Sequence, residues 1–373
     1  EAVGFNDLRP RTSQAMLNDS LGSIIRGIRQ GSPLAAFMGG QAQRLDAISG
    51  RHERVEFIIG NRGAFRWGND LFPFRALFQT VDDDGEPVGI PHEMSLRAEG
   101  IIDKINRLTG PGDVDTGDAE FDRSVFLTGP VAPSLAILTA TTRAHIRKVA
   151  EHYPELIIGH GQVSIDLTQV PSLAEAKKVV AELSGLARIL TLKEKDIATR
   201  LAENAEIDPI PEVAVRNFRT LVEHYPEQSE SVAEHLANAP HAYPEVRLEA
   251  TEKITKPVPA LVDMLSDQVT GARGEMQPTV IRRLAKQLGP YAQDHEVVSA
   301  LLEHLTCDEP VIRKAILELL LEHQPDRTIP VVLAHTDLFD SVTDRVLVAK
   351  LLGLDTQSRG QGLLLRFVQE EHA

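Results

Sequence analysis

Five carboxylates lie within ten residues and could bind a metal ion or transfer protons; they are Asp113, Asp115, Asp118, Glu120 and Asp122. Calcium loops of the EF-hand type need Asp-x-Asp-x-Asp-Gly, followed by a glutamate at position 12. Here Gly117 occupies the fifth position and Asp118 the sixth, so the pattern fails. Two interpretations stay open: an irregular calcium site, and a turn whose Asp and Thr side chains bond the local backbone. We favour the turn.

Two other segments contain groups that could act chemically. His160 stands between two glycines, but no second histidine follows at the spacing of a helical zinc site, so we expect a histidine at the tip of a hairpin. The segment 61–67 combines two arginines with Phe65 and Trp67, which could stack on a nucleic-acid base. A structural turn with partly buried aromatic rings is the favoured alternative. We therefore predict no catalytic, cofactor-binding or metal-binding residue, and no cofactor.

The composition is that of a folded chain of two domains. It has 373 residues, of which 42% are hydrophobic. No stretch approaches the roughly 20 apolar residues that span a bilayer, so insertion of this segment into a membrane is not expected. The single cysteine, Cys307, excludes an intrachain disulfide and fits a reducing compartment. We expect a cytoplasmic protein, with membrane association through residues upstream of Glu1 left open.

The negative charge is concentrated in the second half of the chain. Residues 1–195 have 22 Lys and Arg against 25 Asp and Glu, a net −3, whereas residues 196–373 have 17 against 29, a net −12. An acidic surface repels phosphates, and nucleic-acid binding depends on neutralising them. We expect no nucleic-acid partner; a basic protein partner fits, and acidity that serves only solubility is the alternative.

A pattern recurs along the second half of the chain at an almost constant spacing. Each copy begins with proline or serine, continues with valine and arginine, and keeps the apolar spacing of a helix. The copies start 33, 34, 32 and 31 residues apart, at Pro211, Pro244, Pro278, Pro310 and Ser341. A fixed period with a fixed local pattern is typical of helical repeats, in which each unit covers the apolar flank of its neighbour.

The fourth copy resembles the HEAT signature Asp-x-x-Val-Arg-x-x-Ala, since it contains Asp308-Glu309-Pro310-Val311-Ile312-Arg313-Lys314-Ala315. The period is shorter than the usual 40–47 residues of HEAT units, and is similar to the compact repeats of bacterial HEAT proteins of the phycobilisome-lyase type. The resemblance implies an all-α solenoid of about five repeats over residues 196–354, with a capping segment at 355–373. It also implies that one arginine per unit bonds within the array, namely Arg216, Arg247, Arg282, Arg313 and Arg345. A row of ligand-binding arginines is the minority interpretation.

The third unit is interrupted by a polar segment with two glycines, residues 266–277. We expect a loop there, and loops at the edge of a repeat array often contact partners. The candidate partner-binding residues are therefore Gln268, Arg273, Glu275, Arg282 and Arg313. An inert insertion is the alternative.

Residues 1–195 show no repeat, and their pattern predicts a mixed α+β domain. Strands are expected at 54–59, 74–81, 94–97, 124–127, 155–158 and 163–167. The strand at 94–97 is expected to pair with 74–81, and a hairpin turn is expected at 159–162. Helices are expected at 13–29, 101–108, 132–151 and 173–189. Through Thr116–Asp122, this half resembles a domain that precedes HEAT arrays in uncharacterised bacterial proteins.

These patterns support three hypotheses. The first is a non-catalytic scaffold or adaptor that binds partner proteins through an acidic HEAT-like array. The second is a hydrolase or transferase with its site near residues 113–122 and His160, which requires those residues to converge. The third is a peripheral component of a membrane-associated assembly.

Overall fold

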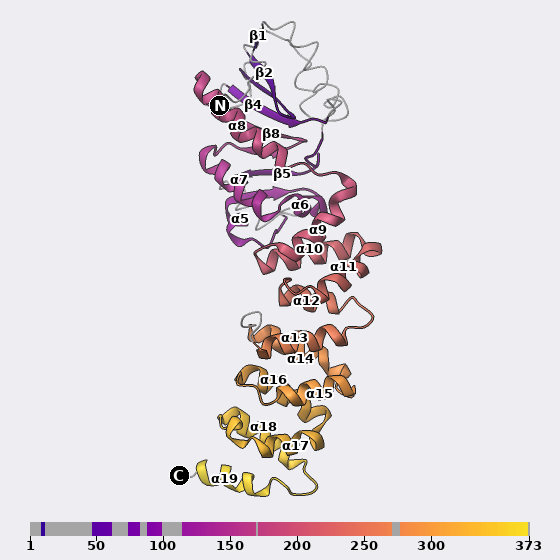
Figure 1. The fold of residues 1–373 in the computed structure, drawn as a ribbon. Coiled ribbons are helices and arrows are strands. Elements are labelled where there is room, and N and C mark those ends of the chain that lie inside the picture. The colour runs from indigo at the N-terminus through magenta and orange to yellow at the C-terminus, as the bar shows by residue number, and fades with distance from the viewer. Residues whose placement is uncertain are drawn as a thin grey trace. The chain divides into compact units, whose positions relative to one another are not determined.

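The computed structural model of the protein describes residues 9–11, 47–61, 74–82, 88–98, 114–168, 171–270 and 277–371. The chain forms two compact units, residues 1–226 and residues 227–373. The first unit contains an antiparallel sheet with helices, and the second is helical in its described residues (Figure 1). The prediction of an α+β region followed by a helical region is therefore confirmed.

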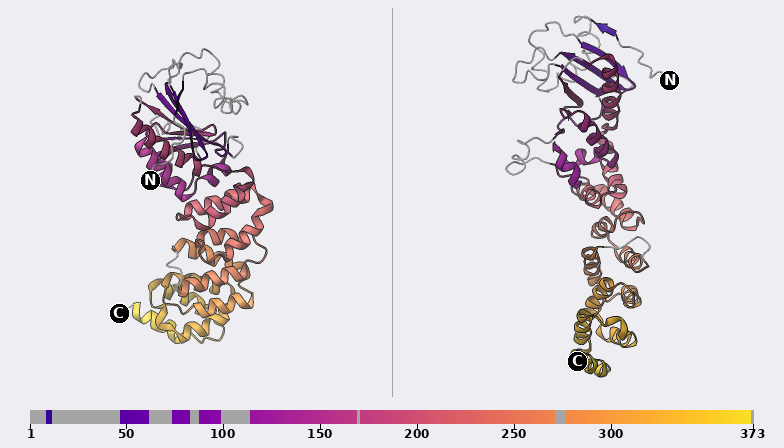
Figure 2. Two further views of the ribbon diagram at one scale, coloured as in Figure 1. Left: turned by 45° about the horizontal axis from the view of Figure 1, so that its top comes forward. Right: turned by 90° about the vertical axis from the view of Figure 1, so that its left-hand side faces the viewer.

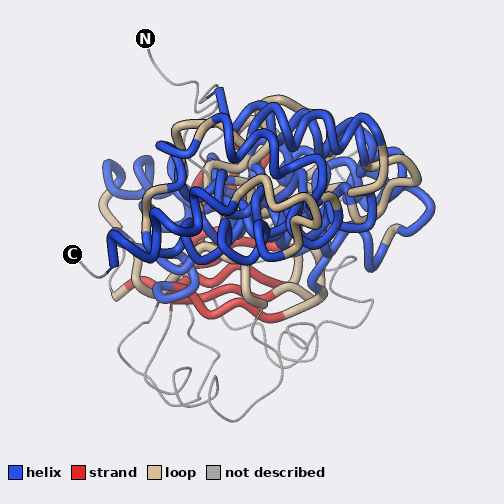
Figure 3. Tube along the Cα trace, turned by 90° about the horizontal axis from the view of Figure 1, so that it is seen from below, coloured by secondary structure: helices blue, strands red, loops and turns tan. Residues whose placement is uncertain are grey.

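The described strands of the first unit form one sheet in the order β1-β2-β3-β4-β8-β7-β5-β6, with every neighbouring pair antiparallel. Figure 3 shows these strands in red, side by side. Their bounds are β1 Arg9–Arg11, β2 Ala47–His52, β3 Val55–Asn61, β4 Phe74–Thr80, β5 Ser95–Ala98, β6 Val125–Thr128, β7 Ile157–Gly159 and β8 Gln162–Leu167.

Successive side chains of a strand point to opposite faces of the sheet, so alternate residues of the central strands form one buried face. Phe57 of β3 lies opposite Phe78 of β4, and their rings stack with centroids 6.1 Å apart. Both rings are buried, and the helix α8, Leu173–Ile189, packs across β3, β4 and β8. The predicted helix at 173–189 is confirmed residue for residue. It starts there because Ser172 and Glu175 form a capping box.

The hairpin predicted at 159–162 is confirmed, since Gly159 pairs with Gln162. His160 and Gly161 take φ angles of +52° and +80°, the positive pair that a type I′ turn requires. The predicted pairing of 94–97 with 74–81 is wrong. Both edges of β4 are occupied by β3 and β8, so β5 pairs with β6 and β7 instead.

One predicted helix is two helices. The segment 132–151 forms α6, Val131–Ile137, and α7, Ala140–His152, because Thr139 takes an extended conformation and caps α7 with its side chain. The short helix α5, Ala119–Ser124, was not predicted. The helices expected at 13–29 and 101–108 lie outside the described residues.

The first unit includes two helices that the sequence pattern assigns to the repeats. They are α9, Ile197–Ile207, and α10, Pro211–His224, and both pack against α6. Between them, the buried side chain of Asn204 donates to the Leu135 carbonyl oxygen at 3.1 Å. The first compact unit thus ends at residue 226, whereas the repeat pattern places the boundary between the two domains at residue 195.

In the second unit, α12 packs on α13 and α13 on α14, and each helix from α15 to α18 packs on the next one along the chain; α12, α14, α16 and α18 also pack in series. The right-hand view of Figure 2 shows these helices in two layers. Their bounds are α11 Pro226–Asn238, α12 Pro244–Thr251, α13 Val258–Thr270, α14 Pro278–Leu288, α15 His295–His304, α16 Pro310–His323, α17 Pro325–Ala334, α18 Val342–Gly353 and α19 Gln361–Glu371.

The five predicted helix starts are confirmed. Helices begin at Pro211, Pro244, Pro278 and Pro310, and Ser341 caps α18 by accepting a hydrogen bond from the Asp344 N–H. Proline suits a first helical position because it lacks an N–H and its φ angle is already helical. A continuous apolar core, from Leu248 to Phe367, joins the helices of this unit.

Replacing Gly117 tests how closely the turn before α5 packs on α10. Gly117 has a φ of +85°, and an added Cβ would lie 2.9 Å from the backbone of Glu212. Gly117→Ala should therefore lower the free energy of unfolding by about 1–3 kcal/mol. Urea unfolding of the full chain, followed by circular dichroism, measures this change.

The matched control is Gly185→Ala within α8, where an added Cβ meets only His145 at 3.9 Å. That change should stabilise the helix by about 0.5–1 kcal/mol. Equal effects of the two substitutions would contradict the close packing of the turn on α10.

Candidate functional site

The described residues of the carboxylate cluster are bonded to their own turn. Asp118 caps α5, accepting hydrogen bonds from the N–H groups of Glu120 and Phe121 at 3.2 and 3.0 Å. Asp122 accepts from the Thr116 hydroxyl at 2.8 Å. These are the local bonds that the turn interpretation requires. Within the part of the chain that the structure describes, no three His, Cys, Asp or Glu side chains are grouped to hold a metal ion; Asp113 lies outside it.

Asp118 also belongs to a buried ionic cluster centred on Arg143 of α7. The Arg143 guanidinium donates to Asp118 at 2.9 Å, to both carboxylate oxygens of Asp208 at 2.8 and 2.9 Å, and to the Leu138 carbonyl oxygen at 2.9 Å. The side chain of Arg143 is 3% exposed, that of Asp118 is 7% exposed and that of Asp208 is 1% exposed. The cluster joins α5 and α7 to the turn between α9 and α10. Sequence reasoning missed it, because nothing in the pattern pairs residues so far apart.

The cluster favours the charged forms of Asp118 and Arg143. Burial acts to raise the pKa of Asp118, but the hydrogen bonds from the Phe121 N–H and from Arg143 outweigh it and lower that pKa. Burial acts to lower the pKa of Arg143, but its hydrogen bonds and ion pairs with Asp208 and Asp118 outweigh it and raise that pKa. These buried groups are paired with one another, so they are not available to a ligand.

The pKa of Asp122 shifts in the opposite direction to that of Asp118. Burial, with the nearby charge of Asp115, raises the pKa of Asp122 to about 6, despite the hydrogen bonds from Thr116. A carboxyl with a raised pKa can act in general acid catalysis. The hydrogen bonds that Asp122 accepts from Thr116, however, belong to the local turn.

The stability of the first unit should respond to this carboxyl. Because the folded-state pKa lies above the unfolded value, the native state binds more protons, and its stability falls as pH rises from 4 through 6. Asp122→Asn should remove that fall, a change of about 1 kcal/mol after solvent screening. Urea unfolding of both proteins at pH 4, 5, 6 and 7 measures the difference, and parallel pH profiles would contradict it.

His160 lies apart from these carboxylates. It is exposed at the tip of the β7–β8 hairpin, and the neighbouring Gly161 approaches His92 and Gln79. Among the described residues, no hydrogen bond or ion pair links His160 to the segment 114–122. Phe65 and Trp67, considered for base stacking, lie outside the described residues.

Most of the recurring arginines make contacts within the protein. Arg247 is buried and donates to the Ala237 carbonyl oxygen at 3.0 Å, and Arg313 is buried and donates to the Cys307 carbonyl oxygen at 2.8 Å. Arg216 bonds the Asp115 backbone, and Arg345 pairs with Asp340. In the third copy, Arg282 is exposed.

The neighbouring Arg283 makes the corresponding contacts, donating to Glu249 at 2.8 Å and Glu252 at 2.6 Å. Four of the five predicted arginines therefore make contacts within the protein, and in the third copy these contacts belong to Arg283, one residue later.

Two of the candidate partner-binding residues are buried. The loop predicted at 266–277 is wrong for residues 266–270, which continue α13 because Gln268 and Val269 pack into the interior of the unit. Gln268 is thus inside the unit, and so is Arg313. Arg282 is exposed, and the other two candidates, Arg273 and Glu275, lie outside the described residues.

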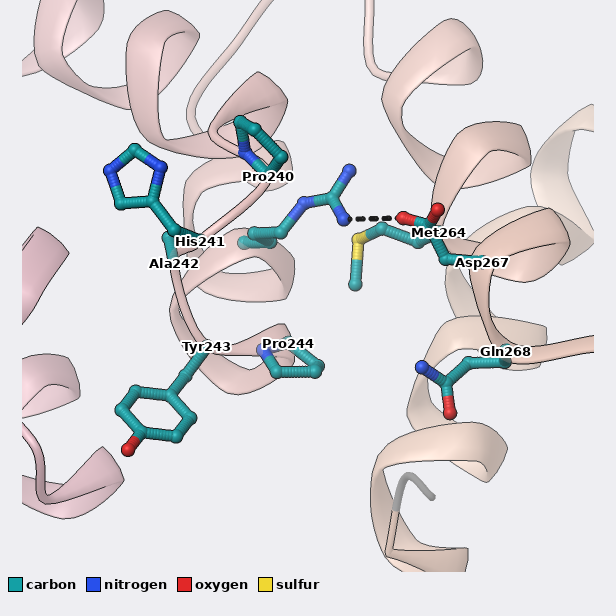
Figure 4. A pocket seen from close by; sticks show the side chains of 9 residues that line it. Pro240, His241, Ala242, Tyr243, Pro244, Met264, Asp267 and Gln268 are labelled. Carbon is teal, nitrogen blue, oxygen red and sulfur yellow. Dashed lines mark hydrogen bonds and ion pairs between the residues drawn. The ribbon is translucent and has the colours of Figure 1, made fainter. Parts of the chain in front are cut away.

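The segment that connects α11 to α12 and the last two turns of α13 enclose a pocket of about 260 Å³. In Figure 4, Pro240, His241, Tyr243 and Pro244 lie across the pocket from the side chains of α13. The residues that line it are Pro240, His241, Ala242, Tyr243, Pro244, Arg247, Met264, Asp267 and Gln268. This pocket, which includes one predicted residue, Gln268, is the candidate site.

The charged groups of the pocket are held by one another. Arg247 donates to Asp267 at 3.0 Å and to Asp263 at 2.8 Å, and the first of these bonds is the dashed line in Figure 4. Arg247 is 3% exposed, Asp267 16% and Asp263 57%. One guanidinium therefore pairs with two carboxylates, of which Asp267 lines the pocket and Asp263 does not.

The burial of Arg247 should make it the costliest of the recurring arginines to remove. Arg247→Ala leaves Asp267 without its partner, and should lower the free energy of unfolding by about 3 kcal/mol. Arg282→Ala, the matched control at the same position of the next copy, should change it by less than about 0.5 kcal/mol. Urea unfolding measures both; similar effects would contradict the assigned contacts.

No model of a known protein family matches the sequence, and no similar curated protein is found. No described helix is long and apolar enough to cross a membrane.

Proposed function

We propose that the protein is a non-catalytic scaffold or adaptor in a reducing compartment such as the bacterial cytoplasm. Its helical region is a HEAT-like array of about five repeats, and this array binds a partner protein with a basic surface. The observation that carries the proposal is the agreement between the repeated sequence pattern, with its period of 31–34 residues, and the starts of α10, α12, α14, α16 and α18.

The packing within the second unit supports this proposal. Each helix pair leaves an apolar flank that the next pair covers, as in the contacts of α14 with α16 and of α16 with α18. Buried arginines such as Arg247 and Arg313 bond the ends of preceding helices, which is the role that the HEAT resemblance implies. Repeat arrays of this kind work by presenting an extended surface.

The charge of the second unit supports a basic partner. Residues 227–373 have 14 Lys and Arg against 23 Asp and Glu, a net −9. Many of the carboxylates are exposed, among them Glu230, Glu234, Glu303 and Asp308. A surface of one sign attracts a partner of the opposite sign and speeds its association.

No specific observation among the described residues favours the enzymatic alternative. Asp115, Asp118 and Asp122 are bonded to their own turn or to Arg143, and no described hydrogen bond or ion pair joins them to His160. A second function is therefore not proposed.

Affinity purification of the full-length protein from its native host, with mass spectrometry of the bound proteins, tests the proposal. We expect a stoichiometric partner with an excess of Lys and Arg, released as salt is raised above physiological ionic strength. Recovery of the chain alone, with crosslinking also negative, would overturn the scaffold hypothesis.

A further inference from the structure

We propose that the partner docks on the exposed side of α11, α13 and α15, here called the acidic face, and contacts it with a segment rich in lysine or arginine. This inference rests on the proposed function and deepens it, because it assigns the side of the helical array that the basic partner contacts. Its basis is the unequal distribution of charged side chains between two sets of helices in the second unit.

The three helices of the acidic face are joined side by side. Arg247 donates to the carbonyl oxygen of Ala237, in the last turn of α11, and also to Asp263 of α13 at 2.8 Å. A hydrogen bond of 3.0 Å connects Ser266 of α13 with His304 of α15. The helices α12, α14, α16 and α18 pack on one another in a separate series.

Negative charge is concentrated on the acidic face. Helices α11, α13 and α15 contain seven Asp and Glu residues and no Lys or Arg, a net −7. The series α12, α14, α16 and α18 contains five Asp and Glu against eight Lys and Arg, a net +3. Solubility depends on the amount of net charge and is favoured when both signs are interspersed. This separation of the signs therefore indicates recognition.

The two sets of helices also differ in how their carboxylates are paired. The other series pairs carboxylates with its own cations, in the pairs Glu249–Arg283, Glu318–Lys314 and Asp344–Arg313. On the acidic face, Glu230, Glu234, Glu296 and Glu303 are exposed, and none of them belongs to an ion pair between described residues. Carboxylates of one sign repel one another, so cations from a partner lower their electrostatic energy.

The sign of this charge decides the chemistry of the partner. A lysine- or arginine-rich segment is attracted, whereas an acidic segment or a phosphate backbone is repelled. Each exposed ion pair contributes little by itself, so the affinity must come from several pairs together and must fall as salt screens them.

Fluorescence anisotropy with the full chain tests this inference. The probe is a capped, fluorescein-labelled dodecapeptide of alternating lysine and serine, compared with the same peptide in which glutamate replaces lysine. We expect saturable binding of the lysine peptide at about 50 mM salt and about tenfold weaker binding at about 500 mM salt. The glutamate peptide should not bind.

Two matched double variants show whether the position of the charge matters. Glu230→Gln combined with Glu303→Gln removes two charges from the acidic face, and should weaken the lysine peptide about fivefold, the effect of two exposed ion pairs. Glu318→Gln combined with Glu322→Gln removes two charges from exposed positions of α16, and should weaken it less than about twofold. Thermal unfolding followed by circular dichroism shows whether each variant is folded.

Carbodiimide crosslinking of the parent chain locates the contact without any substitution. The reagent activates a carboxylate, which then forms an amide bond with a lysine amine of the peptide that touches it, while the carboxylate oxygen leaves with the reagent as a urea. Mass spectrometry should find the peptide on Glu230, Glu234, Glu296 or Glu303.

Equal weakening by the two double variants would show attraction to net charge alone and would overturn the inference. Crosslinks found mainly on Glu318 and Glu322, no binding of the lysine peptide, or equal binding of the glutamate peptide would also overturn it. Failure of the proposed function has a different signature. Recovery of no partner from the host overturns the scaffold hypothesis, whatever the peptide does. A host partner bound equally by the parent and by the Glu230→Gln, Glu303→Gln variant overturns the assignment of the face alone.

Discussion

Pairing of buried guanidinium groups with carboxylates is the constraint on which much of this fold depends. Arg143 is surrounded by Asp118, Asp208 and the Leu138 carbonyl oxygen, and none of these partners lies on its own helix. A buried charge without partners would cost several kcal/mol, so α7 keeps its position only while α5 and the α9–α10 turn keep theirs. The ionic cluster therefore specifies which elements meet, whether or not it adds net stability.

This constraint explains why the boundary between the compact units differs from the boundary that the repeat pattern predicts. The first helix pair of the repeat pattern, α9 and α10, supplies Asp208 to Arg143 and Asn204 to the carbonyl oxygen of Leu135. Those bonds bury polar atoms that would otherwise be unpaired, and they fix the pair against α6. A sequence period cannot reveal such a bond, because it describes what successive units share and not what the first unit contacts.

The sequence predicted those features that are local. The proline at a first helical turn, the helix at 173–189 and the Gly-His-Gly-Gln hairpin each depend on a few adjacent residues, and each is present. The partners of β5 and the burial of Gln268 depend on residues distant in the chain, and both were predicted wrongly. The pocket belongs to this second class: of the residues that line it, only Pro244, Arg247 and Gln268 had been considered, and for other reasons.

The two arginine clusters use the same chemistry with different exposure. Around Arg143 both aspartates are nearly inaccessible, so the cluster is closed to any ligand. Around Arg247, Asp267 is 16% exposed and Asp263 is 57% exposed. Because solvent screens an exposed ion pair, the bond to Asp263 contributes less than the bond to Asp267, and Asp267 is the partner whose loss the buried guanidinium can least tolerate.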